Sequence, residues 1–386
     1  MAFIALGLVS ASLGPTLTAL AHQTRSTLAA ASFLFTGRSL GYLLGSLQGG
    51  RLYDHMRGHP LMASVLLTMA LIMFAVPLVP ALWLLALMLL ILGTAEGALD
   101  VGGNTLLCWV HGARVGPYMN GLHFFFGVGA FLSPIIISRL TLVSGEIVWP
   151  YWTLALLILP VAAWLWRVPS PLPATAQRDA PGAPAPATRL GGSAARLLLV
   201  LIATFFFLYT GAETGFGGWV FTYTVRLGLG SETTAAYLNS LFWGSLTLSR
   251  LLSIPLAAHV TPRAMLWGDL AGCLVGISLI VFWPASPLLL WAGTFIFGFS
   301  MASIFPTVLS FAERRLAITG QITGWFFVGA SAGSMTLPRI IGQLFEAIGP
   351  RMTMRTIMID IAAATAVWAL LTFCTTRAAK DATTGR

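Results

Sequence analysis

The chain has 386 residues, of which 57% are hydrophobic and only 9% are charged, and its mean hydropathy is +0.86. A soluble domain carries about 25% charged residues, so this composition excludes a soluble fold and indicates that lipid is the solvent. The net charge is +9. In a soluble protein this excess would suggest a nucleic-acid partner, but here the arginines lie in short segments between apolar runs, so the positive-inside rule explains them better.

The cysteines and the polar residues indicate no catalytic centre. Cys108, Cys273 and Cys374 lie in or at the ends of apolar runs, and their spacing predicts neither a disulfide framework nor a metal site. No nucleophile is paired with a base in the sequence. We therefore expect no enzyme activity, no catalytic residue, no bound metal and no cofactor.

Apolar runs of about 20 residues, the length that crosses a bilayer, recur along the whole chain. Residues 169–194 are rich in Pro and Ala, which predicts a semi-extended linker on the cytoplasmic side. We predict an all-α membrane protein with an N-terminal six-helix bundle, 1–168, and a C-terminal six-helix bundle, 195–386. The twelve predicted transmembrane helices cover residues 3–21, 28–52, 61–80, 83–108, 117–140, 149–167, 196–220, 234–258, 264–283, 287–311, 319–344 and 354–375.

Basic residues are distributed unevenly between the segments that join these helices. If both termini are cytoplasmic, cytoplasmic segments hold thirteen Lys and Arg residues, external segments hold five, and three lie within helices. This bias follows the positive-inside rule, so we expect a multi-pass protein of the cell membrane with both termini in the cytoplasm. The prevalence of Arg and the lack of an Asn-x-Ser/Thr sequon favour a bacterial inner membrane.

A shift of the sequence by 204 positions brings equivalent residues of the two halves together. It places Gly14 on Gly218 in one helix pair, His55 on His259 in a second, and Pro134 on Pro338 in a third. One offset that serves three helix pairs indicates an internal repeat. A signal peptide cleaved near Ser12 is the competing interpretation of the first run, but that run matches the seventh helix in this repeat.

The densest group of polar residues within a predicted helix lies in the fourth, residues 83–108. Glu96, Asp100 and Asn104 are spaced four residues apart, so they project from one face of the helix. Ionisable residues in a span need a partner or water, so this face must meet another helix or an aqueous cavity. Two carboxylates and an amide suit sugar hydroxyls, a cation or a proton. We assign all three to substrate binding and the two acids to cation coupling; the alternative is a structural network.

Arg38, in the second predicted helix, lies at a depth similar to that of Glu96. We hypothesise that the two side chains pair within the N-terminal bundle and that Arg38 contributes to cation coupling. In the alternative interpretation, Arg38 extends toward the outer surface. Two other intramembrane bases, Arg250 and Arg339, have no partner that the sequence identifies.

Several other residues within the predicted helices are candidates for the transport site. His123 can relay protons or can simply bond to a neighbouring helix, and Glu213 precedes a Gly-rich stretch and is assigned to cation coupling. Tryptophan rings can stack on the C–H faces of a sugar, but they also serve as packing and interfacial residues. The further candidates for substrate binding are Asn120, His123, Trp219, Asn239, Trp243 and Trp325.

The segment after the second helix combines an acid with bases. Asp54 and Arg57 lie at a cytoplasmic helix end, and Arg114 lies in the next cytoplasmic loop. Such groups can form a charge lock that breaks during gating, so we assign these three residues to gating. A plain basic loop is the alternative.

With its repeat, its linker and its Gly50-x-x-x-Asp54 loop, the chain resembles the major facilitator superfamily. The loop departs from the usual pattern, with His55 where a base such as Arg is common and one extra residue before Gly58. Within the superfamily, the chain resembles the fucose–galactose–glucose symporter group and the sodium-dependent glucose transporter branch. The segments that carry this resemblance are Leu99–Asn104, Leu122–Pro134, Gly211–Trp219 and Ser249–Pro255.

The resemblance implies a site at mid-membrane between two halves, with Asp100 and Asn104 serving substrate binding and cation coupling. The fucose symporter also uses an acid in its first helix, where this chain has only hydroxyl residues, which leaves Glu96 or Glu213 as substitutes. We therefore expect alternating-access symport of a monosaccharide with H⁺ or Na⁺ by a monomer. Efflux of an amphipathic or lipid-like compound is one alternative, and a non-transporting receptor on a transporter fold is another.

Overall fold

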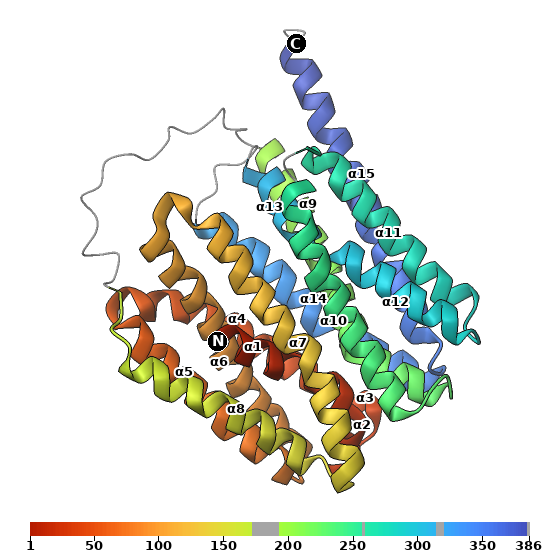
Figure 1. Ribbon diagram of the computed structural model, residues 1–386. Helices are drawn as coiled ribbons and strands as arrows, with labels where there is room; N and C mark the ends of the chain where they lie inside the picture. The colour runs from red at the N-terminus through yellow and green to blue at the C-terminus, as the bar shows by residue number, and fades with distance from the viewer. Residues whose placement is uncertain (172–192, 257–258, 314–319, 384–386) are drawn as a thin grey trace.

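The computed structural model describes residues 1–171, 193–256, 259–313 and 320–383. All regular elements in these ranges are helices (Figure 1). The N-terminal half contains α1 (Ala2–Ser10), α2 (Leu13–Gln23), α3 (Leu28–Ala31), α4 (Phe33–His55), α5 (Gly58–Ala75), α6 (Leu82–His111), α7 (Gly116–Ser144) and α8 (Val148–Arg167). The C-terminal half contains α9 (Ser193–Arg226), α10 (Glu232–Leu256), α11 (Pro262–Phe282), α12 (Pro287–Met301), α13 (Ile304–Glu313), α14 (Gly320–Ala347) and α15 (Met352–Thr383).

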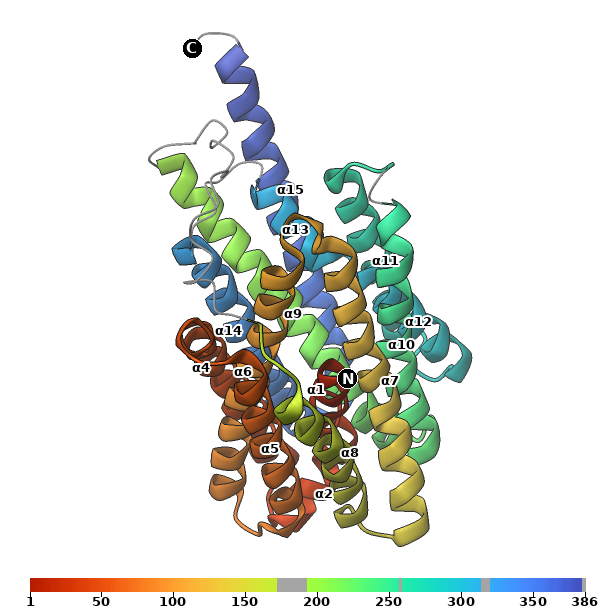
Figure 2. The ribbon, with the colours of Figure 1, turned by 60° about the vertical axis from the view of Figure 1, so that its left-hand side comes forward.

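Two names locate features along these helices. The linker end is the end of the molecule at which α8 finishes and α9 begins, and the far end is the opposite one, where α2 leads into α3 and α14 into α15 (Figures 1 and 2). Most of the predicted linker, residues 172–192, lies outside the described residues.

Eight of the described helical spans are long and apolar enough to cross a membrane, or nine if α1 and α2 form one bent span. The three other long helices, α4, α10 and α14, contain 23, 25 and 28 residues. Counting them as spans gives the predicted twelve. They are less apolar because they lie where the halves meet, α4 against α14 and α10 against α7, so part of their surface faces protein rather than lipid.

Two predicted straight helices are broken in the structure. The first is split into α1 and α2, which are bent by 49°, and the tenth is split into α12 and α13. Pro15 is the third residue of α2 and Pro306 is the third residue of α13. Proline has no N–H to bond the preceding turn and its ring clashes with it, so in each case the helix breaks just before the proline.

Glycines allow the helices to pack backbone against backbone. A Cβ on Gly45 of α4 would collide with the Thr94 carbonyl of α6, and a Cβ on Gly97 of α6 would collide with the Tyr42 carbonyl of α4. Small residues at such contacts are typical of membrane helices, where van der Waals packing replaces the hydrophobic drive. The α4–α6 contact is therefore set by residues that have no side chain.

The repeat inferred from the sequence is visible in the packing. A shift of 204 carries α7, Gly116–Ser144, onto residues 320–348, and α14 covers Gly320–Ala347. Gly129 of α7 lies against the backbone of α1 at Ile4, and Gly333 of α14 lies against the backbone of α9 at Phe207. The same close approach of two helices therefore occurs once in each half.

We predict that Gly45→Ala lowers the unfolding free energy by about 1–3 kcal/mol, because the new methyl group overpacks the α4–α6 contact. Gly50→Ala, in the same helix, is the matched control, since no atom lies within 4 Å of its Cβ position. Thermal unfolding of the purified variants measures the difference. Equal melting temperatures for the two variants would contradict the packing described for Gly45.

Candidate functional site

The break between α1 and α2 creates a binding site for the guanidinium of Arg38. Carbonyls at a helix end have spare hydrogen-bonding capacity, and Arg38 donates to two of them, from Nη1 to Ser10 O at 3.0 Å and from Nη2 to Val9 O at 3.1 Å. The Val9 carbonyl also accepts from the Ser12 N–H at 3.1 Å. The same side chain pairs with Glu96, with Nε to Oε2 at 2.7 Å and Nη2 to Oε1 at 2.5 Å. The predicted pairing is therefore confirmed, and the alternative of an outward-extending Arg38 is wrong.

Glu96 is enclosed by these contacts. Its side chain is 3% exposed, and Oε1 also accepts from the Ser10 hydroxyl at 2.9 Å. A buried charge is tolerated when it is paired and hydrogen-bonded, and Glu96 meets both conditions. In this conformation it joins α1, α4 and α6 rather than facing open solvent.

Asp100 lies one helical turn beyond Glu96 and has different partners. Tyr42 donates its hydroxyl to Oδ2 of Asp100, and Asn104 donates from Nδ2 to Oδ1 at 3.0 Å and to the Asp100 carbonyl at 2.8 Å. Asp100 and Asn104 are both partly exposed. Within the part of the chain that the structure describes, Asp100 forms no ion pair.

Arg38 and Tyr42, both on α4, contact α6 with the same separation along the sequence. Arg38 meets Glu96 and Tyr42 meets Asp100, each pair 58 residues apart, because α4 and α6 run in the same direction. Tyr42 was not among the candidates from the sequence. The signal that identifies it is its position four residues after Arg38, on the same face of α4 that meets the acids of α6.

Ionisable residues of both halves lie around His123. His123 on α7 is within electrostatic range of Asp100 and of Arg250 on α10. Arg250 also faces Glu213 of α9, although these two residues, both in the described part, form no ion pair within 4.0 Å. The structure thus supplies the neighbours of Arg250 that the sequence did not identify. Acids and bases alternate across the boundary between the halves.

The three candidate tryptophans have different environments. Trp219 is fully buried, donates from Nε1 to the Pro338 carbonyl at 3.1 Å and packs on Phe345. Trp325 of α14 is 52% exposed. Trp243 is partly buried, and its ring lies edge-on to Phe126 of α7, with 6.4 Å between centroids. Its Nε1 is buried without a partner among the described residues.

The remaining polar candidates are also separated. Asn239 is fully buried and donates to the Gly217 carbonyl at 2.6 Å, which fastens α10 to α9. Asn120 is exposed, and His123 is partly buried, in an edge-on contact with Phe3 at 6.0 Å. The structure therefore places His123 with Asp100, and it places Asn239 inside the C-terminal half.

The gating candidates lie at the linker end. Asp54, Arg57 and Arg114 are all exposed. As far as the described residues go, Asp54 forms no ion pair with either base in this conformation. The predicted lock is not formed here.

At the far end, by contrast, several polar contacts hold the halves together. The Ala29 N–H donates to Oε2 of Glu346 at 2.8 Å, and the Thr36 hydroxyl donates to the Met335 carbonyl at 2.9 Å. Arg339, which had no assigned partner, lies 5.2 Å from the centre of the Phe33 ring, a cation–π contact. The far end is therefore closed by contacts between α14 and the segment containing α3 and the start of α4.

The sequence matches the Major Facilitator Superfamily over residues 1–338. The chain belongs to this superfamily of transporters. It is 31% identical over 376 residues to sodium-dependent glucose transporter 1A of Mus musculus, covering 89% of this chain and 88% of that protein. It is 32% identical over 376 residues to sodium-dependent glucose transporter 1 of Homo sapiens, covering 89% of this chain and 72% of that protein.

Solved structures of superfamily transporters have the same fold. The nucleoside transporter NupG, in a mutant form, superposes with a TM-score of 0.76 at 13% identity, covering 97% of both chains. A bacterial homologue of the human lysosomal transporter Spinster, in an inward-facing and unoccupied conformation, gives a TM-score of 0.74 at 12% identity, covering 97% of this chain and 95% of that one. The all-α major facilitator fold expected from the sequence is confirmed.

We predict that Glu96→Gln lowers the unfolding free energy by about 3 kcal/mol, because it leaves the Arg38 guanidinium unpaired inside the N-terminal half. Glu146→Gln, at an exposed loop position, is the control and should change little. Thermal unfolding of both variants, and of Arg38→Gln with and without Glu96→Gln, gives the coupling energy of the pair. Additive effects of the two substitutions would mean that the pair is not an energetic unit.

Proposed function

We propose that this major facilitator is a symporter that couples Na⁺ to the movement of a monosaccharide, with Asp100 as the coupling carboxylate. The observation that carries this proposal is a difference in charge compensation. Of the three acids of α6 and α9, Glu96 is paired with Arg38 and Glu213 faces Arg250. Asp100 accepts hydrogen bonds from Tyr42 and Asn104, neither of which carries a charge.

An uncompensated carboxylate within a membrane span is expensive, so it attracts a cation. A bound Na⁺ would remove this charge, and the carboxylate of Asp100, the carbonyl of Asn104 and the hydroxyl of Tyr42 offer the oxygen ligands that hard cations prefer. The names of the mouse and human relatives, which are sodium-dependent glucose transporters, favour Na⁺. A proton on Asp100 would satisfy the same charge requirement, so pH dependence is the competing coupling.

The substrate would lie beside Asp100, between α6, α7 and α10. Asn104 and His123 supply polar groups there, and the Nε1 of Trp243 is a buried donor without a partner in the described part of the chain. Such a donor is unfavourable when unpaired, and a sugar hydroxyl would satisfy it. Asn120 and Trp325, exposed on α7 and α14, would meet the sugar on its way toward the linker end.

Other candidates have roles that follow from their contacts. We assign to Glu96 and Arg38 the support of α6 behind Asp100, and to Glu213 the positioning of Arg250. Trp219 and Asn239 would hold α9 against α14 and α10, since their polar groups already bond to backbone carbonyls. These residues would affect coupling through the helices that they fix.

The transport cycle would rock residues 1–168 against residues 195–386. The contacts of Glu346, Thr36 and Arg339 close the far end. The separation of Asp54 from Arg114 fits a linker end that is open, and Asp54, Arg57 and Arg114 would pair when it closes. Because the sequence assigns thirteen basic residues to the segments on one side of the membrane and five to the other, we place the linker end and both termini in the cytoplasm of a bacterial inner membrane, with one chain as the transporting unit.

Asp100→Asn should abolish Na⁺-driven accumulation of sugar in proteoliposomes, because the neutral amide no longer requires a cation. Counterflow of sugar, which needs binding but no gradient, should persist. Glu146→Gln, at its exposed site, should accumulate sugar as the wild type does. Unchanged accumulation by Asp100→Asn would rule out its coupling role, and export of an amphipathic compound by the wild type would favour the efflux alternative.

A ligand screen would identify the substrate and the ion together. Monosaccharides should raise the melting temperature of the purified protein, and more so in Na⁺ than in K⁺ at equal ionic strength, because stabilisation follows ligand concentration over Kd. The sugar effect should lose its dependence on Na⁺ in Asp100→Asn. If sugars stabilised the protein equally in Na⁺ and in K⁺, and if this stabilisation depended on pH, the coupling ion would be H⁺ rather than Na⁺.

A further inference from the structure

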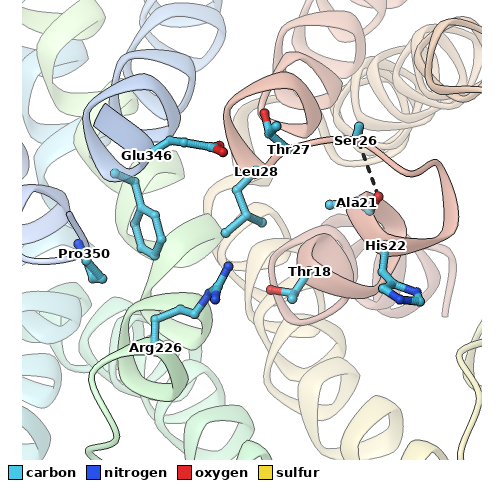
Figure 3. A pocket seen from close by; sticks show the side chains of 10 residues that line it. Thr18, Ala21, His22, Ser26, Thr27, Leu28, Arg226, Glu346 and Pro350 are labelled. Carbon is cyan, nitrogen blue, oxygen red and sulfur yellow. Dashed lines mark hydrogen bonds between the residues drawn. The ribbon is translucent and has the colours of Figure 1, made fainter. Parts of the chain in front are cut away.

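A cavity lies at the far end, away from Asp100, and both halves of the chain form its walls (Figure 3). Its volume is about 500 Å³, within the size range of small-molecule sites. Thr18 and His22 of α2 line it on one side, and Arg226 at the end of α9 and Phe345 of α14 line it on the other. Neither the proposed transport cycle nor the far-end contacts use these four side chains.

The charges in this cavity are not balanced. Glu346 also lines it, but one of its carboxylate oxygens already accepts from the Ala29 N–H at 2.8 Å. In Figure 3 this carboxylate points toward Thr27, while the guanidinium of Arg226 points toward Thr18. Arg226 forms no ion pair within the described ranges. Among those residues, the cavity therefore presents an unpaired cation and has its anion engaged by the backbone.

The remaining walls suit a hydroxylated molecule. Thr18 and His22 are one helical turn apart on α2, and both are exposed. In Figure 3 the Thr18 hydroxyl points toward Arg226, whereas the His22 imidazole points away from Arg226, at the edge of the cavity. The ring of Phe345 is held by its contact with Trp219, at 5.3 Å between centroids. Phe345 is 6% exposed, so it adds a small apolar surface to the wall of the cavity. A guanidinium binds a carboxylate through two parallel hydrogen bonds.

From these features, we infer that the far-end cavity is a second ligand site, which binds a small hydroxylated carboxylic acid such as a hexuronate. Arg226 would take the carboxylate, Thr18 and His22 the hydroxyls, and Phe345 the face of the ring. Because both halves form the walls, the site exists only while the far end is closed. A ligand that binds one state alone shifts the population toward it, so this ligand inhibits transport. The inhibition rests on the proposed alternating access, whereas the binding does not.

The test uses the purified full chain and isothermal titration calorimetry with D-glucuronate, at constant Na⁺ and ionic strength. The wild type should bind D-glucuronate, and Arg226→Gln should weaken this binding about tenfold or more, as expected for the loss of one charge-assisted contact. Arg355→Gln is the matched control, because Arg355 is an exposed arginine that lies near Tyr223, one turn before Arg226 on α9, and does not line the cavity. It should leave the Kd unchanged.

The proposed effect of the ligand on the closure of the far end is measured separately. In a background without the native cysteines, Ala29→Cys and Gln343→Cys form a pair across the halves, since Gln343 Nε2 lies 3.4 Å from the Ala29 carbonyl. D-glucuronate should increase the yield of the crosslink between them. An unchanged yield at saturating D-glucuronate would overturn the inhibitory role.

Three results would overturn the site itself. One is the absence of D-glucuronate binding to the wild type, and another is an equal loss of binding in Arg226→Gln and Arg355→Gln. The third is binding of phosphatidylglycerol, but not of D-glucuronate, through Arg226, which would make the cavity a lipid site. Asp100→Asn should still bind D-glucuronate, so failure of the coupling proposal can be told apart from failure of this one.

Discussion

The pairing of Arg38 with Glu96 determines how the N-terminal half can be built. Both charges lie within a membrane span, where neither is tolerated alone, and Arg38 also donates to the Ser10 and Val9 carbonyls at the α1–α2 break. One guanidinium thus stabilises a broken helix and fixes α4 against α6. The register that brings Arg38 to Glu96 also brings Tyr42 to Asp100, so the position of the candidate coupling carboxylate depends on this ion pair.

Glycine packing supports the same arrangement. Because α4 and α6 touch through backbone at Gly45 and Gly97, the acids of α6 are held at a fixed distance from the side chains of α4. The charges then differ in their compensation: Glu96 has a full partner and Glu213 faces Arg250. Asp100 has two hydrogen-bond donors and His123 nearby, but no ion pair among the described residues. In a symporter of this kind, the bound cation balances the charge of the coupling carboxylate. A second unpaired carboxylate close to the first would compete for the same cation.

The two ends of the boundary between the halves are held differently. At the far end, Glu346, Thr36 and Arg339 make contacts between the halves, whereas at the linker end the charged residues Asp54 and Arg114 stay apart. The far-end cavity lies among the closing contacts, so its occupancy and the closure of this end are thermodynamically linked. Regulation at such a site requires no contact with the transported substrate, because a ligand there acts on the equilibrium between states.

The sequence by itself determined the fold class and the repeat, because hydropathy and the 204-residue offset are local or periodic properties. It offered the Arg38–Glu96 pair as a hypothesis, and the structure decided between that pair and an outward-extending Arg38. It identified the acids of α6 by their four-residue spacing. It did not reveal the break after Ser10, the hydrogen bond from Tyr42 to Asp100, or the neighbours of Arg250. Each of these depends on which helices lie side by side. Nor could it separate Trp219, buried with its Nε1 bonded, from Trp243, whose Nε1 has no partner in the described chain. Tertiary packing alone decides which polar groups are satisfied and which remain free for a ligand.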